Sequence, residues 1–156
     1  MDSSLFDDVT DALRGLVPAQ LGTLHQQPRR YGLKVWLTDP GGQRGGPPRE
    51  HYEAQVIGAR LVEGATVLAL EVGFHSEYPK VVDNDAVLAR LGRHERRWRK
   101  VLGSEAVVGA FLGRPDPWRR ISETWPDPDL SEPGLAIEIA LRLTDYITAL
   151  EPSRTT

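Results

Sequence analysis

Apolar and polar residues alternate along three successive stretches in the first half of the chain, residues 31–38, 51–57 and 66–75. A period of two places alternate side chains on opposite faces of a β-strand, so each stretch predicts a strand with one buried face. The expected core-facing residues of the first strand are Leu33, Val35 and Leu37. Three successive strands of this kind favour an antiparallel meander.

Three other stretches carry apolar residues at helical spacing, which predicts amphipathic helices. The first covers residues 5–16. The second begins after the capping residues 83–85 and runs to Leu102. The third covers residues 135–150, and Pro152 is expected to stop it because proline cannot donate a helical hydrogen bond.

The remaining segments complete the predicted order of elements. Residues 26–30 are polar and are expected to form a connector, whereas 106–112 and 118–125 predict two further strands. The first of these two also fits a buried helical turn. The sequence thus predicts an α+β fold in the order α-β-β-β-α-(β-β)-α, with a mainly antiparallel sheet packed against about three helices. We expect a single domain over 1–151 and a flexible C-terminal tail over 152–156.

The composition excludes several classes of protein. The chain has 156 residues, of which 40% are hydrophobic and 26% charged, as in a soluble globular domain. Its net charge of -3 gives no overall attraction to nucleic acid or anionic membranes. Cysteine is absent, which excludes disulfides, zinc–thiolate clusters and a thiol nucleophile. No apolar stretch is long enough to span a bilayer and the acidic start lacks a signal-peptide pattern, so we expect a cytoplasmic protein.

The polar face of the predicted central hairpin is the strongest candidate for chemistry. His51 and Glu53 share one face of their strand, and Glu71 and His75 share a face of the next. Pairing of the two strands would bring His51 near Glu71, a cluster of the kind that binds a metal ion or moves a proton. Glu71 and His75 are about 13 Å apart along the strand, so they are not expected to ligate one ion together. The alternative is a solvated face with an ordinary cross-strand His–Glu pair.

Sequence motifs give little support for catalysis. The order of a helix, three strands and a helix also occurs in metal-dependent nucleases, but their Glu-x-Lys pattern is absent, because Glu71 is followed by Val72 and Gly73. The Gly-rich residues 41–46 lack the Lys-Ser/Thr of a phosphate-binding loop. No motif implies a cofactor. The alternative catalytic or metal-binding set comprises His51, Glu53 and Glu71.

The second predicted helix carries a basic stripe, whose members lie at helical positions i, i+3, i+7 and i+10. They are Arg90, Arg93, Arg97 and Lys100. Such a stripe favours electrostatic docking of an acidic peptide, a phosphate group or RNA, and the alternative is a solvated outer face paired with the chain's own acids. No RNA-binding aromatic pair or helix-turn-helix pattern accompanies it, so nucleic acid is not the expected partner.

Four tryptophans provide further candidates for recognition. Trp98 fits the apolar face of its helix, but Trp36 lies on the polar side of its strand. Trp118 and Trp125 lie among Pro, Asp and Arg residues, which is typical of binding hot spots. The alternative is that each tryptophan covers an edge of the core with its indole N–H satisfied.

The leading functional hypothesis is a non-catalytic binding module, an adaptor or a peptide-binding chaperone that uses a sheet face or edge together with the basic helix. The predicted order of elements resembles that of secretion-type peptide-binding chaperones, and this resemblance implies a peptide or protein partner and a homodimer. The candidate partner-binding residues are Trp36, Arg93, Arg97, Lys100, Trp118 and Trp125. The alternative hypothesis is a small cytosolic metal-dependent or acid–base enzyme that uses the His51, Glu53 and Glu71 face.

Overall fold

The computed structural model describes residues 5–39 and 46–154. The Gly-rich residues 41–45 and the last two residues of the predicted tail lie outside these ranges. The elements, in chain order, are α1 (Leu5–Arg14), β1 (Thr23–Arg29), β2 (Gly32–Thr38), β3 (Glu50–Gly58), β4 (Leu68–Ser76), α2 (Val81–Gly92), α3 (Glu95–Leu102), β5 (Val107–Ala110), β6 (Arg119–Pro126) and α4 (Leu135–Arg154).

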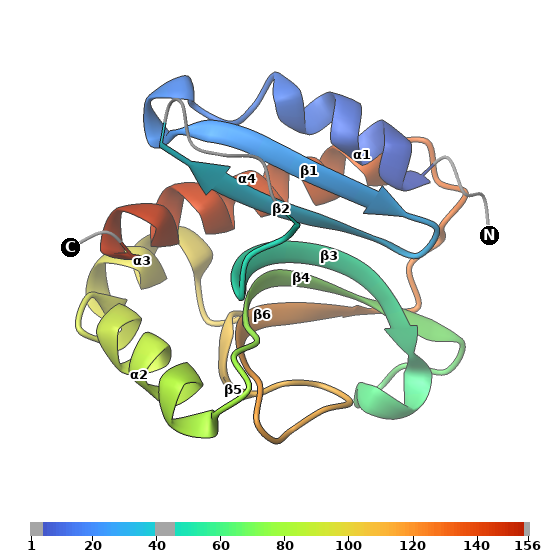
Figure 1. Cartoon of the computed structure of the whole chain (residues 1–156). Coiled ribbons are helices and arrows are strands. Elements are labelled where there is room, and N and C mark those ends of the chain that lie inside the picture. The colour runs from blue at the N-terminus through green and yellow to red at the C-terminus, as the bar shows by residue number, and fades with distance from the viewer. Residues whose placement is uncertain (1–4, 40–45, 155–156) are drawn as a thin grey trace.

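The strands form one six-stranded antiparallel sheet in the order β1-β2-β3-β4-β6-β5. Helices α1 and α4 lie side by side behind the sheet, while α2 and α3 lie beside it, as Figure 1 shows. The predicted α+β fold with an antiparallel meander packed against helices is therefore confirmed. The β5–β6 hairpin is also confirmed, so the alternative of a helical turn over 106–112 is wrong.

The core lies between the sheet and helices α1 and α4. The predicted alternation holds in the central strands, where the core-facing side chains are fully buried. Examples from the sheet are Leu33, Val35, Tyr52, Ala54, Leu70, Val72, Phe74 and Ile121. Burial of one large apolar side chain stabilises the folded state by about 1.5–3 kcal/mol, so this layer fixes which face of each strand points inward. The intervening residues of β3 and β4 are consequently placed on the opposite face of the sheet.

The predicted connector over 26–30 is wrong, because most of it belongs to the edge strand β1. β1 pairs with β2 along its whole length, from Thr23 opposite Thr38 to Arg29 opposite Gly32. Its residues are half-buried or exposed, so its sequence has no apolar alternation to reveal it. Backbone hydrogen bonds rather than side-chain burial define this strand, and Pro28 is tolerated because edge strands need not donate every N–H.

The helix predicted to follow the capping residues 83–85 and run to Leu102 is two helices, α2 and α3, with a break at Arg93 and His94. The capping prediction is wrong, because α2 begins at Val81 and residues 83–85 lie inside it. Leu91 and Trp98 are buried on either side of this break. The Trp98 indole N–H donates to the Leu91 carbonyl at 2.9 Å, so both of these buried polar groups have a hydrogen-bond partner at the break. The basic stripe is accordingly not continuous, because Arg93 ends one helix and the later cations lie on another.

The predicted stop of the last helix at Pro152 is also wrong, because α4 continues to Arg154. Ser153 is fully buried, and the Arg154 guanidinium pairs with Glu50 at 3.2 Å and with Glu151 at 2.7 Å. These contacts hold the final turn against the sheet. The predicted tail thus begins inside a packed helix.

We predict that Gly73→Ala destabilises the protein by about 1–3 kcal/mol, because overpacking a tight contact costs that much. A Cβ at Gly73 would lie 2.5 Å from Ser122 Cα in the neighbouring strand β6. The free energy of unfolding from urea titration measures the loss. Gly109→Ala in β5 is the matched control, since a Cβ there meets nothing within 4 Å. Equal stability of the two variants would contradict the close packing of β4 against β6.

Candidate metal centre

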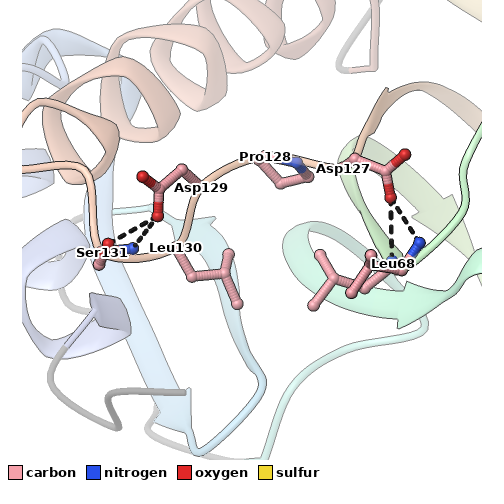
Figure 2. Close-up of a pocket in the computed structure, with 7 residues that line it drawn as sticks. Leu68, Asp127, Pro128, Asp129, Leu130 and Ser131 are labelled. Carbon is pink, nitrogen blue, oxygen red and sulfur yellow. Dashed lines mark hydrogen bonds between the residues drawn. The ribbon is translucent and has the colours of Figure 1, made fainter.

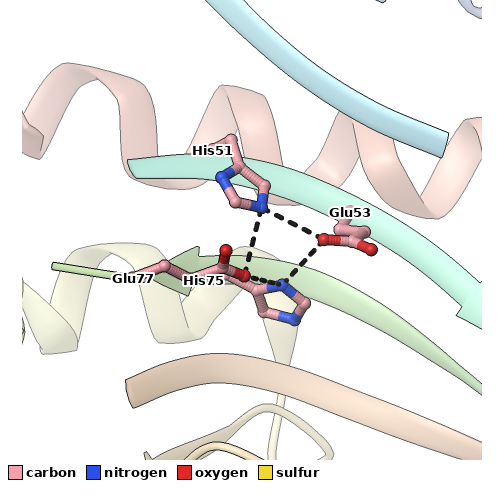
Figure 3. A group of neighbouring side chains, drawn as sticks. All are labelled: His51, Glu53, His75 and Glu77. Carbon is pink, nitrogen blue, oxygen red and sulfur yellow. Dashed lines mark hydrogen bonds and ion pairs between the residues drawn. The ribbon is translucent and has the colours of Figure 1, made fainter. Parts of the chain in front are cut away.

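Four imidazole and carboxylate side chains meet on the face of the sheet that points away from the core. His51 and Glu53 come from β3, His75 comes from β4, and Glu77 follows directly after β4. Figure 3 shows the four side chains turned toward one another. The strand register explains the meeting, because His51 lies opposite His75 and Glu53 lies opposite Gly73.

The facing atoms of this group form a ring of alternating nitrogen and oxygen. Glu53 Oε1 lies 3.1 Å from both His51 Nε2 and His75 Nδ1. Glu77 Oε2 lies 3.5 Å from the same two nitrogens. One ligand atom from each of the four residues lies within 4.8 Å of all the others. We call these four residues the His–Glu cluster.

The His–Glu cluster is shielded from water. The exposed fractions of its side chains are 1% for His51, 3% for Glu53, 0% for His75 and 12% for Glu77. The Phe111 ring contacts His75 edge-on with ring centroids 4.6 Å apart, and Trp118 packs in turn on Phe111. The segment between β5 and β6 therefore covers one side of the cluster.

Each member of the cluster also has a partner on its outer side. The Nδ1–H of His51 donates to the Pro48 carbonyl at 3.0 Å, and His75 Nε2 lies 2.9 Å from Glu71 Oε2. The outer oxygen of Glu53 accepts a hydrogen bond from Arg29 at 2.6 Å. For Glu77, the outer oxygen lies 3.9 Å from Lys34 Nζ. The orientation of every member is thus fixed from outside the ring.

The predicted proximity of His51 and Glu71 is wrong, because Glu71 lies opposite Gln55 in the register. Glu71 instead contacts His75, although the two are four residues apart. Gly73 lies between them on the same face and has no side chain, so both can lean over it. Glu71 is held by hydrogen bonds from Gln55 at 2.8 Å and Ser122 at 2.6 Å.

Sequence reasoning found His51 and Glu53 but left His75 and Glu77 out of the candidate set. A signal for them exists in the repeated pattern His-x-Glu, which occurs at residues 51–53 and again at 75–77. β3 and β4 are antiparallel and pair with His51 opposite His75, so the two His-x-Glu segments lie next to each other. Only the register shows that these segments pair.

Electrostatics favours positive charge inside the ring. Burial lowers the pKa of His75, but the charge of Glu71 and hydrogen bonds with its carboxylate neighbours outweigh burial and hold that pKa well above 6.5. The pKa of His51 is also raised, since its hydrogen bonds to Glu53 and Glu77 outweigh burial. Burial raises the pKa of Glu77, but hydrogen bonds with both histidines outweigh it and lower this pKa to about 2.

The hydrogen bonds around the cluster limit where protons can be. A neutral imidazole carries one N–H, and the outer nitrogens of His51 and His75 face acceptors, the Pro48 carbonyl and the Glu71 carboxylate. The inner nitrogens, His51 Nε2 and His75 Nδ1, would then direct lone pairs at carboxylate oxygens. This repulsion is avoided if each imidazole takes up a second proton or if both nitrogens bind one cation. The ring therefore needs two positive charges, as two protons or as one divalent metal ion.

None of the other candidate residues belongs to this cluster, although Trp118 packs on Phe111, which contacts His75. Trp36 is 9% exposed and stacks on His25 with ring centroids 5.6 Å apart. Trp118 directly precedes β6 and Trp125 lies near the end of that strand, about 23 Å away along the chain at the usual rise of a strand. The Trp125 indole N–H donates to Glu123 at 2.8 Å.

Of the basic candidate residues, Arg97 and Lys100 lie on α3, and Arg93 lies at the break between α2 and α3. Arg93, Arg97 and Lys100 are all exposed. Arg97 donates a hydrogen bond to Ser153 at 3.0 Å, which ties α3 to the end of α4. These cations remain candidates for binding a partner.

A pocket of about 500 Å³ lies at the start of β4, between Leu68 and the segment 127–131 (Figure 2). The Asp127 carboxylate accepts backbone N–H groups of residues 66–68, and Asp129 accepts from Ser131, so the polar groups serve the local turns. Leu68 is seven residues from His75, about 23 Å along the strand. The pocket thus gives no access to the His–Glu cluster.

Comparisons with protein-family models, curated proteins and solved structures find no match for this chain. Among the described residues, no helix combines the length and apolar character needed to cross a bilayer.

We predict that the metal-free protein is most stable between about pH 4.5 and 6.5. The raised pKa of His75 contributes stability that is fully present below its unfolded value of 6.5 and is lost as the pH rises through the folded value. The lowered pKa of Glu77 contributes stability present above 4.5 and lost as the pH falls toward about 2. Urea titrations with a chelator present measure this profile. A shallower alkaline decline in His51→Gln is expected, and an identical decline would contradict the assignment.

Proposed function

We propose that this protein binds a divalent transition-metal ion at the His–Glu cluster. The observation that carries the proposal is the convergence of one ligand atom from each of four side chains within 4.8 Å. The proposed ligands are His51 Nε2, Glu53 Oε1, His75 Nδ1 and Glu77 Oε2. Glu71, which the sequence suggested as a ligand, becomes the outer partner of His75.

The ligand types select the class of ion. Imidazole and carboxylate together suit Zn²⁺ and its neighbours among the first-row transition metals, whereas Ca²⁺ and Mg²⁺ prefer all-oxygen sites. The charges also balance, because two carboxylates neutralise one divalent ion when both histidines are neutral. Such an ion would replace the two protons that the inner nitrogens otherwise require.

The test is a calorimetric titration of chelator-treated protein with Zn²⁺. We expect binding of one ion per chain and a rise in unfolding free energy of about 2.7 kcal/mol at a free Zn²⁺ concentration 100 times the dissociation constant. His51→Ala should weaken binding at least 100-fold, since it removes a ligand. His25→Ala is the matched control, because His25 lies on β1 beside Trp36. Equal affinities of the two variants would contradict the proposal.

A second proposal keeps the partner-binding hypothesis for α3. The observation that favours it is charge, since Arg96, Arg97 and Lys100 are exposed and the one acid of this helix, Glu95, pairs with Arg99 at 2.8 Å. The proposed partner is an acidic peptide segment of a cytoplasmic protein, bound by electrostatic attraction. A homodimer and a chaperone-like role belong to the same proposal.

For this second proposal, we predict that Arg97→Glu with Lys100→Glu weakens binding of a fluorescent oligoglutamate peptide at least 10-fold at low salt, because both changes place repulsion on the docking face. Fluorescence anisotropy measures the affinity. The control variant reverses charge at Arg60 and Lys80, two exposed cations on other segments. Similar losses in both variants would indicate a net-charge effect and contradict a site on α3.

A further inference from the structure

We infer that the metal centre is closed: the four side chains of the His–Glu cluster complete a tetrahedral coordination sphere, so that the ion is structural and binds no water. This inference rests on the proposed metal binding and deepens it. It specifies the coordination number, the outer partners of the ligands and the role of the ion. Each of these statements can be disproved while metal binding itself is confirmed.

The four sides of the ring match the spacing of neighbouring ligand atoms around a four-coordinate ion. Bonds of about 2.0–2.2 Å place neighbouring ligand atoms of a tetrahedral zinc ion about 3.4 Å apart. The four sides of the ring measure 3.1, 3.1, 3.5 and 3.5 Å, which bracket this value. The two diagonals of the ring, which are at most 4.8 Å, must shorten to the same value, so tetrahedral ligation needs side-chain adjustments of up to about 1.4 Å.

The outer partners select one nitrogen of each histidine for the ion. The Pro48 carbonyl takes the Nδ1–H of His51 and leaves Nε2 for the metal, whereas Glu71 takes the Nε2–H of His75 and leaves Nδ1. Metal-bound histidines usually donate their second N–H to a carbonyl or a carboxylate in this way. Glu71 is itself fixed by Gln55 and Ser122, so it is a positioning residue for His75.

Burial argues against an open coordination position. Catalytic zinc sites have three protein ligands and keep the fourth position for water or substrate, whereas structural sites use four protein ligands. Here three of the four side chains are at most 3% exposed, and Phe111 closes the side next to His75. Glu77 completes the set from the one partly exposed side, with its outer oxygen near Lys34.

The position of Glu77 indicates what the ion would hold together. Glu77 follows the last residue of β4 and leads into α2. A bound ion would join this connection to His51 and Glu53 of β3, beside the hydrogen bonds that Asn84 of α2 accepts from Ser76 and Tyr78. The ion would thus fix the junction between the sheet and α2.

The experiment loads the chelator-treated protein with Co²⁺, whose visible absorption is strong in four-coordinate and weak in six-coordinate sites. We expect strong absorption that saturates at one Co²⁺ per chain and disappears on addition of Zn²⁺. Weak, six-coordinate absorption at the same stoichiometry would overturn the closed site and leave the proposed metal binding standing. Failure to bind either Co²⁺ or Zn²⁺ would overturn both.

Two variants separate ligand from positioning residue. Glu71→Gln should lower Co²⁺ affinity about 10–100-fold with the band shape unchanged, as expected for a lost outer partner. Glu77→Ala should change the band shape itself, because water would replace a ligand, and its partly exposed position makes the variant tolerable to the fold. Glu63→Gln, at an exposed acid between β3 and β4, is the control. An unchanged band shape in Glu77→Ala would contradict four-side-chain ligation.

Discussion

Burying charged groups on the sheet is the constraint on which the rest of this structure depends. A carboxylate removed from water is costly unless opposite charge and hydrogen bonds compensate it, and β3 and β4 bury Glu53 and Glu71 almost completely. The compensation comes from His51 and His75 between the acids and from Arg29 outside them. The two central strands are therefore held together on both faces, by apolar packing on one and by charge on the other.

Gly73 connects the two faces. Its lack of a side chain lets β6 approach β4 closely, and it opens the space over which Glu71 and His75 meet. The close approach brings Ser122 to Glu71, whose position then orients the His75 ring. Packing of the sheet and orientation of the cluster are thus consequences of the same small residue.

The predictable parts of the fold are those in which burial leaves a pattern in the sequence. β2, β3 and β4 alternate because one face packs on the helices, and His51 and Glu53 were found from the same alternation. β1 leaves no such pattern, since backbone pairing at the sheet edge holds it. The roles of His75 and Glu77 depend on the register of β3 against β4, which no single stretch of sequence contains.

The arrangement also separates the two proposed roles. All four cluster side chains point toward one another, so they offer a partner almost no surface, whereas Arg96 and Lys100 of α3 are exposed. α3 packs on α4, whose last turn is tied by Arg154 to Glu50 at the start of β3. Because β3 also supplies His51 and Glu53, the cluster and α3 are connected through β3 and α4. Metal binding and peptide docking are therefore compatible roles of one domain, and each is tested independently of the other.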